Sequence, residues 1–122
     1  MDKKFYITTP IYYPSAKPHM GHAYSSIIAD FFARFKRMDG FDVQFLTGTD
    51  EHGLKIQRSA EKQNIEPLVF CNQISQTFRD LSQTLNLTNT DFIRTTEDRH
   101  KKSVQHLWNE LEKNDDIYLS KY

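Results

Sequence analysis

Two histidines three positions apart carry the first chemical signal in the chain. His19, Gly21 and His22 belong to an HMGH segment that directly precedes a long helical pattern. The start of a helix presents unpaired backbone N–H groups and a partial positive charge, so it attracts phosphate. Each imidazole can donate a hydrogen bond to a phosphate oxygen, and glycine lets a flat base approach closely. The segment therefore favours stabilisation of an α-phosphate in a five-coordinate transition state, although a surface helix cap would explain the same histidines.

Asp50 is the second candidate. It follows a hydrophobic run and lies in the polar loop 48–53, close to His52. A carboxylate at the end of a strand is suited to holding the ammonium group of a ligand. The alternative for Asp50 is a turn residue or a helix cap, and Glu51 equally fits a solvated acid in a first helical turn.

An apolar wall precedes the histidines in the proline-rich segment 10–18. Ile11, Tyr12 and Tyr13 follow Pro10 there. Such a wall next to the Asp50 carboxylate would suit an amino acid with an apolar side chain. Ordinary packing of a rigid loop is the alternative explanation.

A strand–helix–strand pattern must position these groups. Residues 5–9 predict a buried strand and residues 43–47 predict a second one. Between them, large apolar residues recur at helical spacing up to a stop at Gly40: Tyr24, Ile27, Ile28, Phe31, Phe32, Phe35 and Met38. This βαβ unit implies a parallel sheet, in which ligands bind beyond the carboxyl ends of the strands. Loops 10–22 and 48–53 should therefore meet at the carboxyl ends of the strands, which we call the mouth of the sheet.

The rest of the chain continues the alternation of elements. A polar helix to about residue 62 and a helix opened by Pro67 precede residues 91–96, which predict a third strand or an extended segment. Thr95 is expected to cap the last helix. Four apolar residues of that helix should be buried: Val104, Leu107, Trp108 and Leu111. Residues 117–122 predict the beginning of a further strand.

Composition narrows the function classes. The 16 Lys and Arg balance the 16 Asp and Glu among 122 residues, so overall charge gives no argument for nucleic-acid binding. Hydrophobic residues make up 38% of the chain. This fraction is low for a self-sufficient α/β domain, and it hints that part of the core comes from residues outside this sequence.

The cysteine count and the apolar runs exclude further classes. Cys71 is the single cysteine, so an internal disulfide is impossible. The spacing of His19, His22 and His52 matches no common zinc pattern, and we expect no protein-bound metal. No run approaches the roughly 18 apolar residues of a membrane span, so we expect no membrane partner. We expect cytoplasmic residence and leave import into an organelle open.

Three segments together resemble the N-terminal part of methionyl-tRNA synthetases, a family of class I aminoacyl-tRNA synthetases. They are TTPIYYPSAKPHMGH at 8–22, FLTGTDEHG at 45–53 and FIRTTEDRHK at 92–101, and the likeness extends over essentially the whole chain. HMGH stands where class I synthetases have a His-Ile-Gly-His type signature. The resemblance implies an α/β fold in which residues 1–122 form the N-terminal half of a Rossmann-type parallel sheet with flanking helices. This partial catalytic domain would end near the start of the family's connective insertion.

The resemblance also implies an activity. The family activates methionine with ATP, supplied as its Mg²⁺ complex, to methionyl adenylate, and then transfers the methionyl group to tRNA(Met). His19 and His22 would contact the ATP phosphates as catalytic groups. Gly21 would lie against the adenine.

The same resemblance implies a methionine site. Asp50 would hold the α-ammonium group of the amino acid. Ile11 and Tyr13 would border the methionine side chain, and His52 would line the same pocket.

The chain also departs from the family pattern. The second signature, a Lys-Met-Ser-Lys-Ser type loop, is absent, as are the connective and anticodon-binding domains. We therefore expect an N-terminal piece of a synthetase whose tRNA contacts lie mostly elsewhere. Two alternatives stay open: another HxGH nucleotidyltransferase, and a non-catalytic or incompletely folded fragment.

Overall fold

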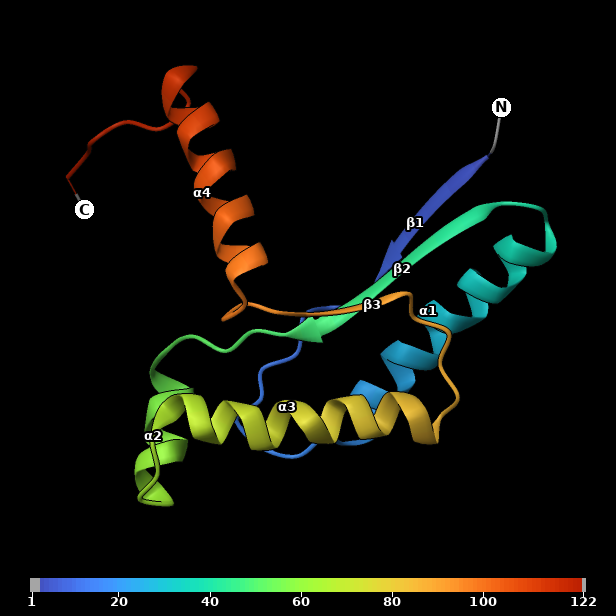
Figure 1. Ribbon diagram of the computed structural model, residues 1–122, viewed down its shortest axis with the longest axis horizontal. Helices are drawn as coiled ribbons and strands as arrows, with labels where there is room; N and C mark the ends of the chain where they lie inside the picture. The colour runs from blue at the N-terminus through green and yellow to red at the C-terminus, as the bar shows by residue number, and fades with distance from the viewer. Residues whose placement is uncertain (1–2, 122) are drawn as a thin grey trace.

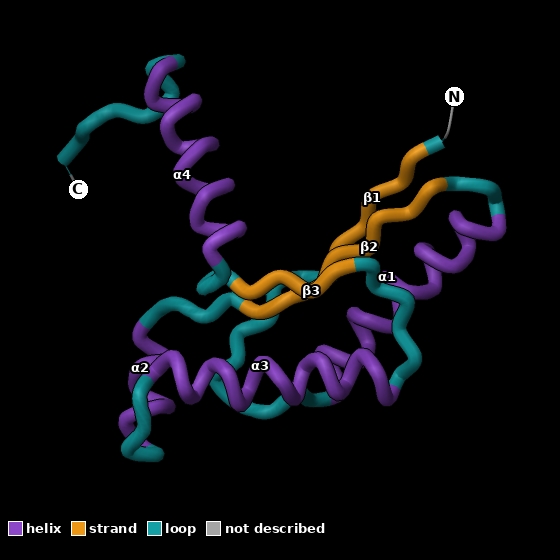
Figure 2. Tube along the Cα trace, viewed as in Figure 1, coloured by secondary structure: helices purple, strands orange, loops and turns teal. Residues whose placement is uncertain are grey.

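The computed structural model describes residues 3–121 as a three-stranded sheet with four helices (Figure 2). The elements are β1 (Lys4–Thr8), α1 (Met20–Met38), β2 (Asp42–Thr49), α2 (Leu54–Lys62), α3 (Pro67–Thr84), β3 (Asp91–Arg94) and α4 (Asp98–Lys113). The strand order is β1-β2-β3, and both strand pairs are parallel. The predicted half of a Rossmann-type sheet is therefore confirmed. Within the described residues, no helix is both long enough and apolar enough to cross a membrane.

One face of the sheet carries the core. Figure 1 shows α1, α2 and α3 on the same side of the strands, while α4 projects away from them. On β2, Val43 and Phe45 are buried against Ala29 and Ala33 of α1. Between α2 and α3 a second buried cluster forms, made of Ile56, Ala60, Phe70 and Cys71. Burial, followed by the nearby Glu51 charge, raises the pKa of the Cys71 thiol to about 11.

The first strand differs from its prediction as a buried strand. Its residues alternate between exposed and half-buried, and Tyr6 is 64% exposed. Among residues 3–121, β1 lies at the edge of the sheet and pairs with β2 alone. An edge strand with one uncovered face cannot be buried on both sides, and for this reason the prediction was wrong.

Helix α1 forms where predicted, but the side that is buried is not the side that carries the large apolar residues. The buried residues of α1 are Ser26, Ala29, Asp30 and Ala33, of which Ala29 and Ala33 pack on β2. The seven large apolar residues that predicted the helix are 39% to 87% exposed. Small side chains let the helix approach the strands closely, and the apolar stripe then points outward.

Asp30 is buried because the chain supplies it with partners. Its carboxylate accepts hydrogen bonds from Arg34 Nε and from both the amide and the hydroxyl of Thr88, each at 2.6 Å. Burial by itself raises the pKa of Asp30, but these bonds and the Arg34 charge outweigh it, so the pKa lies below its ordinary value. The carboxylate thereby ties α1 to the connection that precedes β3.

The C-terminal part of the chain corrects three predictions. Helix α4 forms, but Val104, Leu107 and Trp108 are 48% to 60% exposed, since α4 projects from the body. Its N-cap is Glu97, which makes no side-chain cap, and not Thr95. Residues 117–121 form no strand, and Tyr122 lies outside the described residues.

Candidate active site

The two polar loops meet at the carboxyl ends of the strands, as predicted. The Tyr12 N–H donates to the Gly48 carbonyl at 3.0 Å, and the Asp50 N–H donates to the Tyr12 carbonyl at 2.8 Å. These bonds make an isolated parallel bridge between Tyr12 and Thr49 beyond the end of β1. The segment that leads to the histidines is therefore attached to the strand that leads to Asp50.

His19 and His22 cap α1 reciprocally. His19 is the N-cap, and its Nδ1 accepts the Gly21 N–H at 3.0 Å. His22 Nδ1 accepts the His19 N–H at 3.0 Å in return. A neutral imidazole that accepts at Nδ1 carries its proton on Nε2, so each ring keeps one N–H donor free of the cap. The helix cap and a phosphate contact use different atoms of the same rings, so the two explanations of the histidines are compatible.

Aromatic packing holds the His22 ring. Tyr12 and Phe78 each meet it edge-on, with ring centroids 4.8 and 5.1 Å away. The Tyr12 hydroxyl lies 2.9 Å from Ser26 Oγ on α1. Burial and, after it, the neighbouring His19 lower the pKa of His22. This shift favours the neutral ring, and the bond that Nδ1 accepts leaves the proton of the neutral ring on Nε2.

Sequence reasoning underrated Tyr12. It was considered part of an apolar wall, but it is buried, and its stacking on Phe78 links the loop to α3. Its neighbours Ile11 and Tyr13 are 43% and 55% exposed. All three residues are apolar, so the sequence held no alternation of polarity that could single out Tyr12.

Gly21 has a steric role that the sequence did not reveal. A Cβ atom at this position would lie 2.9 Å from His19 Cε1 and 3.1 Å from His19 Nδ1. Glycine therefore leaves room for the capping ring of His19. Contact with an adenine stays a prediction.

Asp50 is half-buried at the mouth. Its Oδ1 atom lies 3.4 Å from the His52 backbone nitrogen and 3.4 Å from Thr95 Oγ1. His52 is exposed, and its Nε2 lies 3.3 Å from the Thr95 carbonyl oxygen. Asp50 and His52 are thus brought together, next to a residue of the 92–101 segment.

Glu51 is buried, contrary to the solvated acid that we kept as an option. Its side chain is 0% exposed and pairs with Arg94, with Nε–Oε1 at 2.7 Å and a second nitrogen 3.0 Å from Oε2. Thr49 and Thr96 also donate to the carboxylate. Burial by itself raises the pKa of Glu51, but the Arg94 and threonine bonds outweigh it and hold the pKa below its ordinary value.

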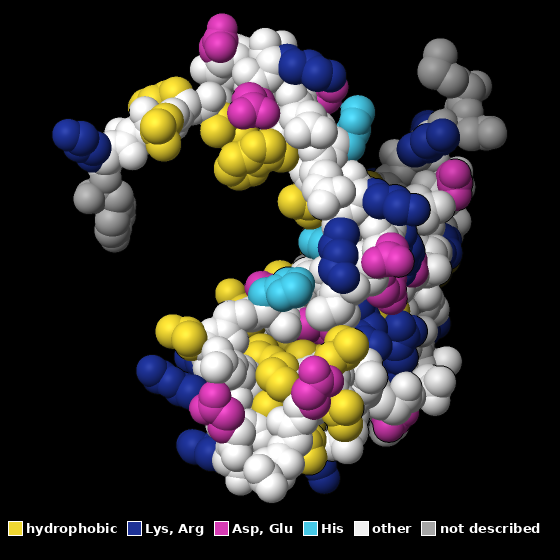
Figure 3. All heavy atoms as spheres, turned by 60° about the vertical axis from the view of Figure 1, so that its left-hand side comes forward, with side chains coloured by type: hydrophobic (Ala, Val, Ile, Leu, Met, Phe, Trp, Pro, Cys, Tyr) yellow, Lys and Arg dark blue, Asp and Glu magenta, His cyan; other side chains and the backbone are white. Residues whose placement is uncertain are grey.

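Two of the predicted methionine contacts, Ile11 and His52, border separate hollows. Ile11 borders a hollow of about 250 Å³ on the uncovered face of the sheet, beside Gly48 and Ile93. His52 borders another of about 260 Å³ beside His100 at the base of α4. Figure 3 shows the molecule hollowed between α4 and the body, with histidine side chains at the base of this hollow. A common pocket for Ile11, Tyr13, Asp50 and His52 therefore stays a prediction.

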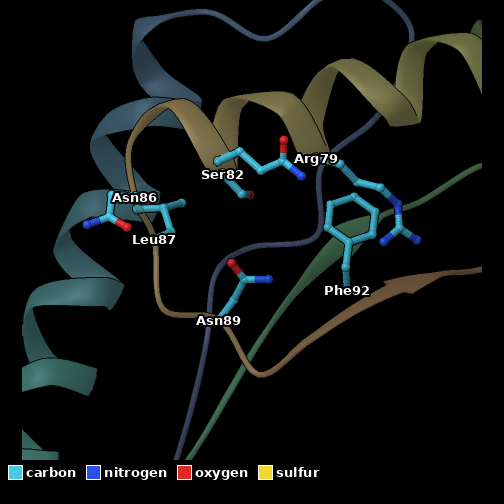
Figure 4. Close-up of a pocket in the computed structure, with 7 residues that line it drawn as sticks. Arg79, Ser82, Asn86, Leu87, Asn89 and Phe92 are labelled. Atoms are coloured by element: carbon cyan, nitrogen blue, oxygen red, sulfur yellow. The ribbon is translucent and has the colours of Figure 1, made fainter.

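A further hollow lies away from the histidines. It measures about 410 Å³ and lies between the C-terminal part of α3 and β3, lined by Arg79, Asn86, Asn89 and Phe92 among others (Figure 4). The Arg79 guanidinium lies over the Phe92 ring, 4.2 Å from its centroid. In residues 3–121 no group of three or more His, Cys, Asp or Glu side chains is arranged to hold a metal ion.

Comparison with known proteins decides the family. The family model described as "tRNA synthetases class I (M)" matches residues 5–122. The chain belongs to this family of class I methionyl-tRNA synthetases. It is 53% identical to the mitochondrial methionine–tRNA ligase of Takifugu rubripes over 121 residues, which are 99% of this chain and 20% of that protein. It is 52% identical to the methionine–tRNA ligase of Rickettsia conorii over 122 residues, which are 100% of this chain and 24% of the relative.

A solved synthetase structure has the same architecture. The Mycobacterium tuberculosis methionyl-tRNA synthetase bound by methionyl-adenylate matches with a TM-score of 0.94 at 44% identity. The match covers 98% of this chain and 24% of that one. The chain thus spans between a fifth and a quarter of the length of these synthetases.

Proposed function

We propose that residues 1–122 form the N-terminal part of the catalytic domain of a methionine–tRNA ligase. The reaction joins methionine and ATP to methionyl adenylate and pyrophosphate, and the methionyl group then passes to tRNA(Met), through contacts mostly outside this segment. The observation that carries the proposal is the reciprocal cap of His19 and His22, which leaves two N–H donors at a helix start, at the end of a loop whose Tyr12 carbonyl accepts the Asp50 N–H. Family membership supports it. Cytoplasmic residence stays a prediction, as relatives include mitochondrial and bacterial enzymes.

In the first step a methionine carboxylate oxygen attacks the α-phosphorus of ATP. A new O–P bond forms, the bond from the α-phosphorus to the bridging oxygen breaks, and pyrophosphate leaves. Negative charge grows on the phosphate oxygens in the transition state. The Nε2–H groups of His19 and His22 are proposed to donate to these oxygens, and Mg²⁺ enters with ATP as part of the substrate.

Asp50 is proposed to hold the other reactant. Its carboxylate would bind the α-ammonium group, so that the methionine carboxylate faces the nucleotide. Methionine has no charged side-chain group, so its selection depends on apolar contact, to which Ile11 and Tyr13 are proposed to contribute. Burying such a side chain is worth roughly 1.5–3 kcal/mol.

Calorimetric titration of the chain with methionine, isoleucine and ATP tests the proposal. We expect binding of methionine in preference to isoleucine, and separate binding of ATP. Asp50→Asn should weaken methionine binding by about tenfold or more and leave ATP binding within twofold. His22→Ala should do the reverse. Equal loss of both ligands in either variant would contradict the assigned roles.

Amino-acid dependence separates the alternatives. A nucleotidyltransferase of another kind would bind ATP with no response to methionine. A non-catalytic fragment would bind neither ligand, or would bind methionine without forming adenylate in an ATP–pyrophosphate exchange assay.

A further inference from the structure

Each residue of the segment 94–96 contacts the loop from Asp50 to His52. Both segments lie at the carboxyl ends of neighbouring strands, β3 and β2. The loop contains two residues predicted to contact methionine, whereas no role was predicted for 94–96 in the site. The contacts include an ion pair, hydroxyl hydrogen bonds and a backbone carbonyl contact, and together they determine the conformation of the loop.

Thr95 is the centre of these contacts. It is 6% exposed, and its N–H donates to the Thr49 carbonyl at 3.1 Å. Its Oγ1 accepts the Glu51 N–H at 2.8 Å. Because that bond uses a lone pair, the hydroxyl proton is free to be donated to Asp50 Oδ1, which lies 3.4 Å away. The Thr95 carbonyl oxygen lies 3.3 Å from His52 Nε2.

The two neighbours of Thr95 in the sequence, Arg94 and Thr96, both bind the side chain of Glu51, the middle residue of the loop. The Arg94 guanidinium meets both oxygens of the Glu51 carboxylate and also donates to Asn72 Oδ1 at 2.6 Å. The Thr96 hydroxyl donates to the same carboxylate. Glu51 is 0% exposed, so its charge depends on these partners and cannot turn outward without losing them.

We propose that residues 94–96 are a clamp that orients the loop 50–52, and that Thr95 is the positioning residue for Asp50 and His52. Thr95 does not touch a ligand in this role. It fixes the Glu51 amide and directs the Asp50 carboxylate toward the mouth. The consequence for methionine rests on the proposed function above, whereas the clamp itself rests on these contacts alone.

Amide hydrogen exchange and methionine titration of the full chain test the clamp in Thr95→Val and Thr95→Ser. Valine keeps the shape and removes the hydroxyl, and serine keeps the hydroxyl. In Thr95→Val we expect the Glu51 amide to exchange about five- to tenfold faster, the factor set by one hydrogen bond. The Phe45 amide, in the strand β2 that precedes the loop, should exchange as in the wild type. Thr95→Ser should restore the Glu51 rate.

Methionine affinity should follow the same order. It should fall by about five- to tenfold in Thr95→Val and return in Thr95→Ser. An unchanged Glu51 rate in Thr95→Val, or equal acceleration at Glu51 and Phe45, would overturn the clamp. If the wild type binds no methionine, the proposed function fails, but the exchange rates still decide the clamp.

A second variant keeps the test decisive if Thr95→Val does not fold. Thr96→Val removes only one donor to the Glu51 carboxylate, at a half-buried position. We expect a smaller acceleration at Glu51, about two- to fivefold, with Phe45 unchanged. No acceleration would overturn the proposal.

Discussion

The mouth of the sheet and the outer side of α1 differ in how their side chains are partnered. At the mouth, polar groups are paired: the buried Glu51 with Arg94, the buried Tyr12 with Ser26, and the exposed His19 with the half-buried His22. On α1, the large apolar side chains are exposed, with Phe31 at 63%. Across residues 3–121, no buried side-chain nitrogen or oxygen lacks a hydrogen-bond partner.

This contrast separates a site whose polar groups find their partners within the described chain from a helix face whose large side chains are exposed. The polar site is assembled by contacts between loops 10–22 and 48–53 and the segment 94–96, all within the described chain. The apolar side of α1 takes no part in that assembly. Geometry at the mouth should therefore be sensitive to single atoms, whereas the outer side of α1 should tolerate substitution.

The largest expected effect comes from Gly48→Ala. A Cβ atom there would lie 2.0 Å from the Ile93 carbonyl oxygen and 2.7 Å from the Ile93 side chain, so β3 would have to move from β2. We expect a loss of more than about 4 kcal/mol in the free energy of unfolding, measured by urea denaturation. Gly21→Ala, which meets only the His19 ring, is the matched control and should cost about 1 kcal/mol. Equal costs would contradict the packing described.

Glu51→Gln should be the next most costly change. It removes the charge from a buried pair and leaves the Arg94 guanidinium without a carboxylate partner, at a cost of about 3 kcal/mol. Thermal and urea unfolding at pH 7 measure it. A cost below about 1 kcal/mol, as for an exposed pair, would contradict the burial of this carboxylate.

The same carboxylate predicts how stability depends on pH. The pKa of Glu51 lies below its ordinary value of 4.5 in the folded chain, so its contribution is complete above about pH 4.5. That contribution is lost as the pH falls through the lowered pKa. Glu51→Gln should therefore flatten the loss of stability as the pH falls below about 4.5. A variant with the same pH dependence as the wild type would assign the acid sensitivity to Asp30 and Asp91, whose pKa values are also lowered.

Substitutions on the two sides of α1 sharpen the comparison directly. Ala33 is 0% exposed between the helix and the sheet, so Ala33→Leu should cost about 2 kcal/mol or more. Phe31→Ser, on the outer side, should change stability by less than about 0.5 kcal/mol. Calorimetric melting of both variants measures the difference. A larger loss for Phe31→Ser would mean that the outer stripe is packed.

A small loss of stability is expected of Tyr12→Phe. It removes the hydroxyl that lies 2.9 Å from Ser26 Oγ and keeps the ring against His22 and Phe78. We expect a loss of about 1 kcal/mol in urea unfolding. Tyr13→Phe, at an exposed position, is the control and should change nothing measurable.

Elements and motifs were predictable from the sequence because they depend on near neighbours. The βαβ unit, the helix from Pro67 and the meeting of the two loops all follow from local spacing and from the rules of parallel sheets. The buried side of α1 was not predictable, because a strong apolar stripe and a stripe of small residues predict the same helix but opposite orientations.

Partners distant in sequence explain the remaining errors. Glu51 looks like a surface acid until Arg94, 43 residues later, is placed beside it by the register of β2 and β3. Thr95 fits a helix cap until the Glu51 amide reaches its hydroxyl. Such pairs depend on how strands align, which composition and periodicity do not reveal.

Nitrogen-15 NMR of the histidine rings at pH 7.5, with and without Mg²⁺-ATP, tests the central claim most directly. Both His19 and His22 should carry their proton on Nε2, since Nδ1 of each accepts a backbone N–H. Addition of the nucleotide should shift both Nε2–H signals and leave the Nδ1 acceptors in place. A proton on Nδ1 of either ring, or Nε2 signals that ignore the nucleotide, would contradict a phosphate site at this helix start.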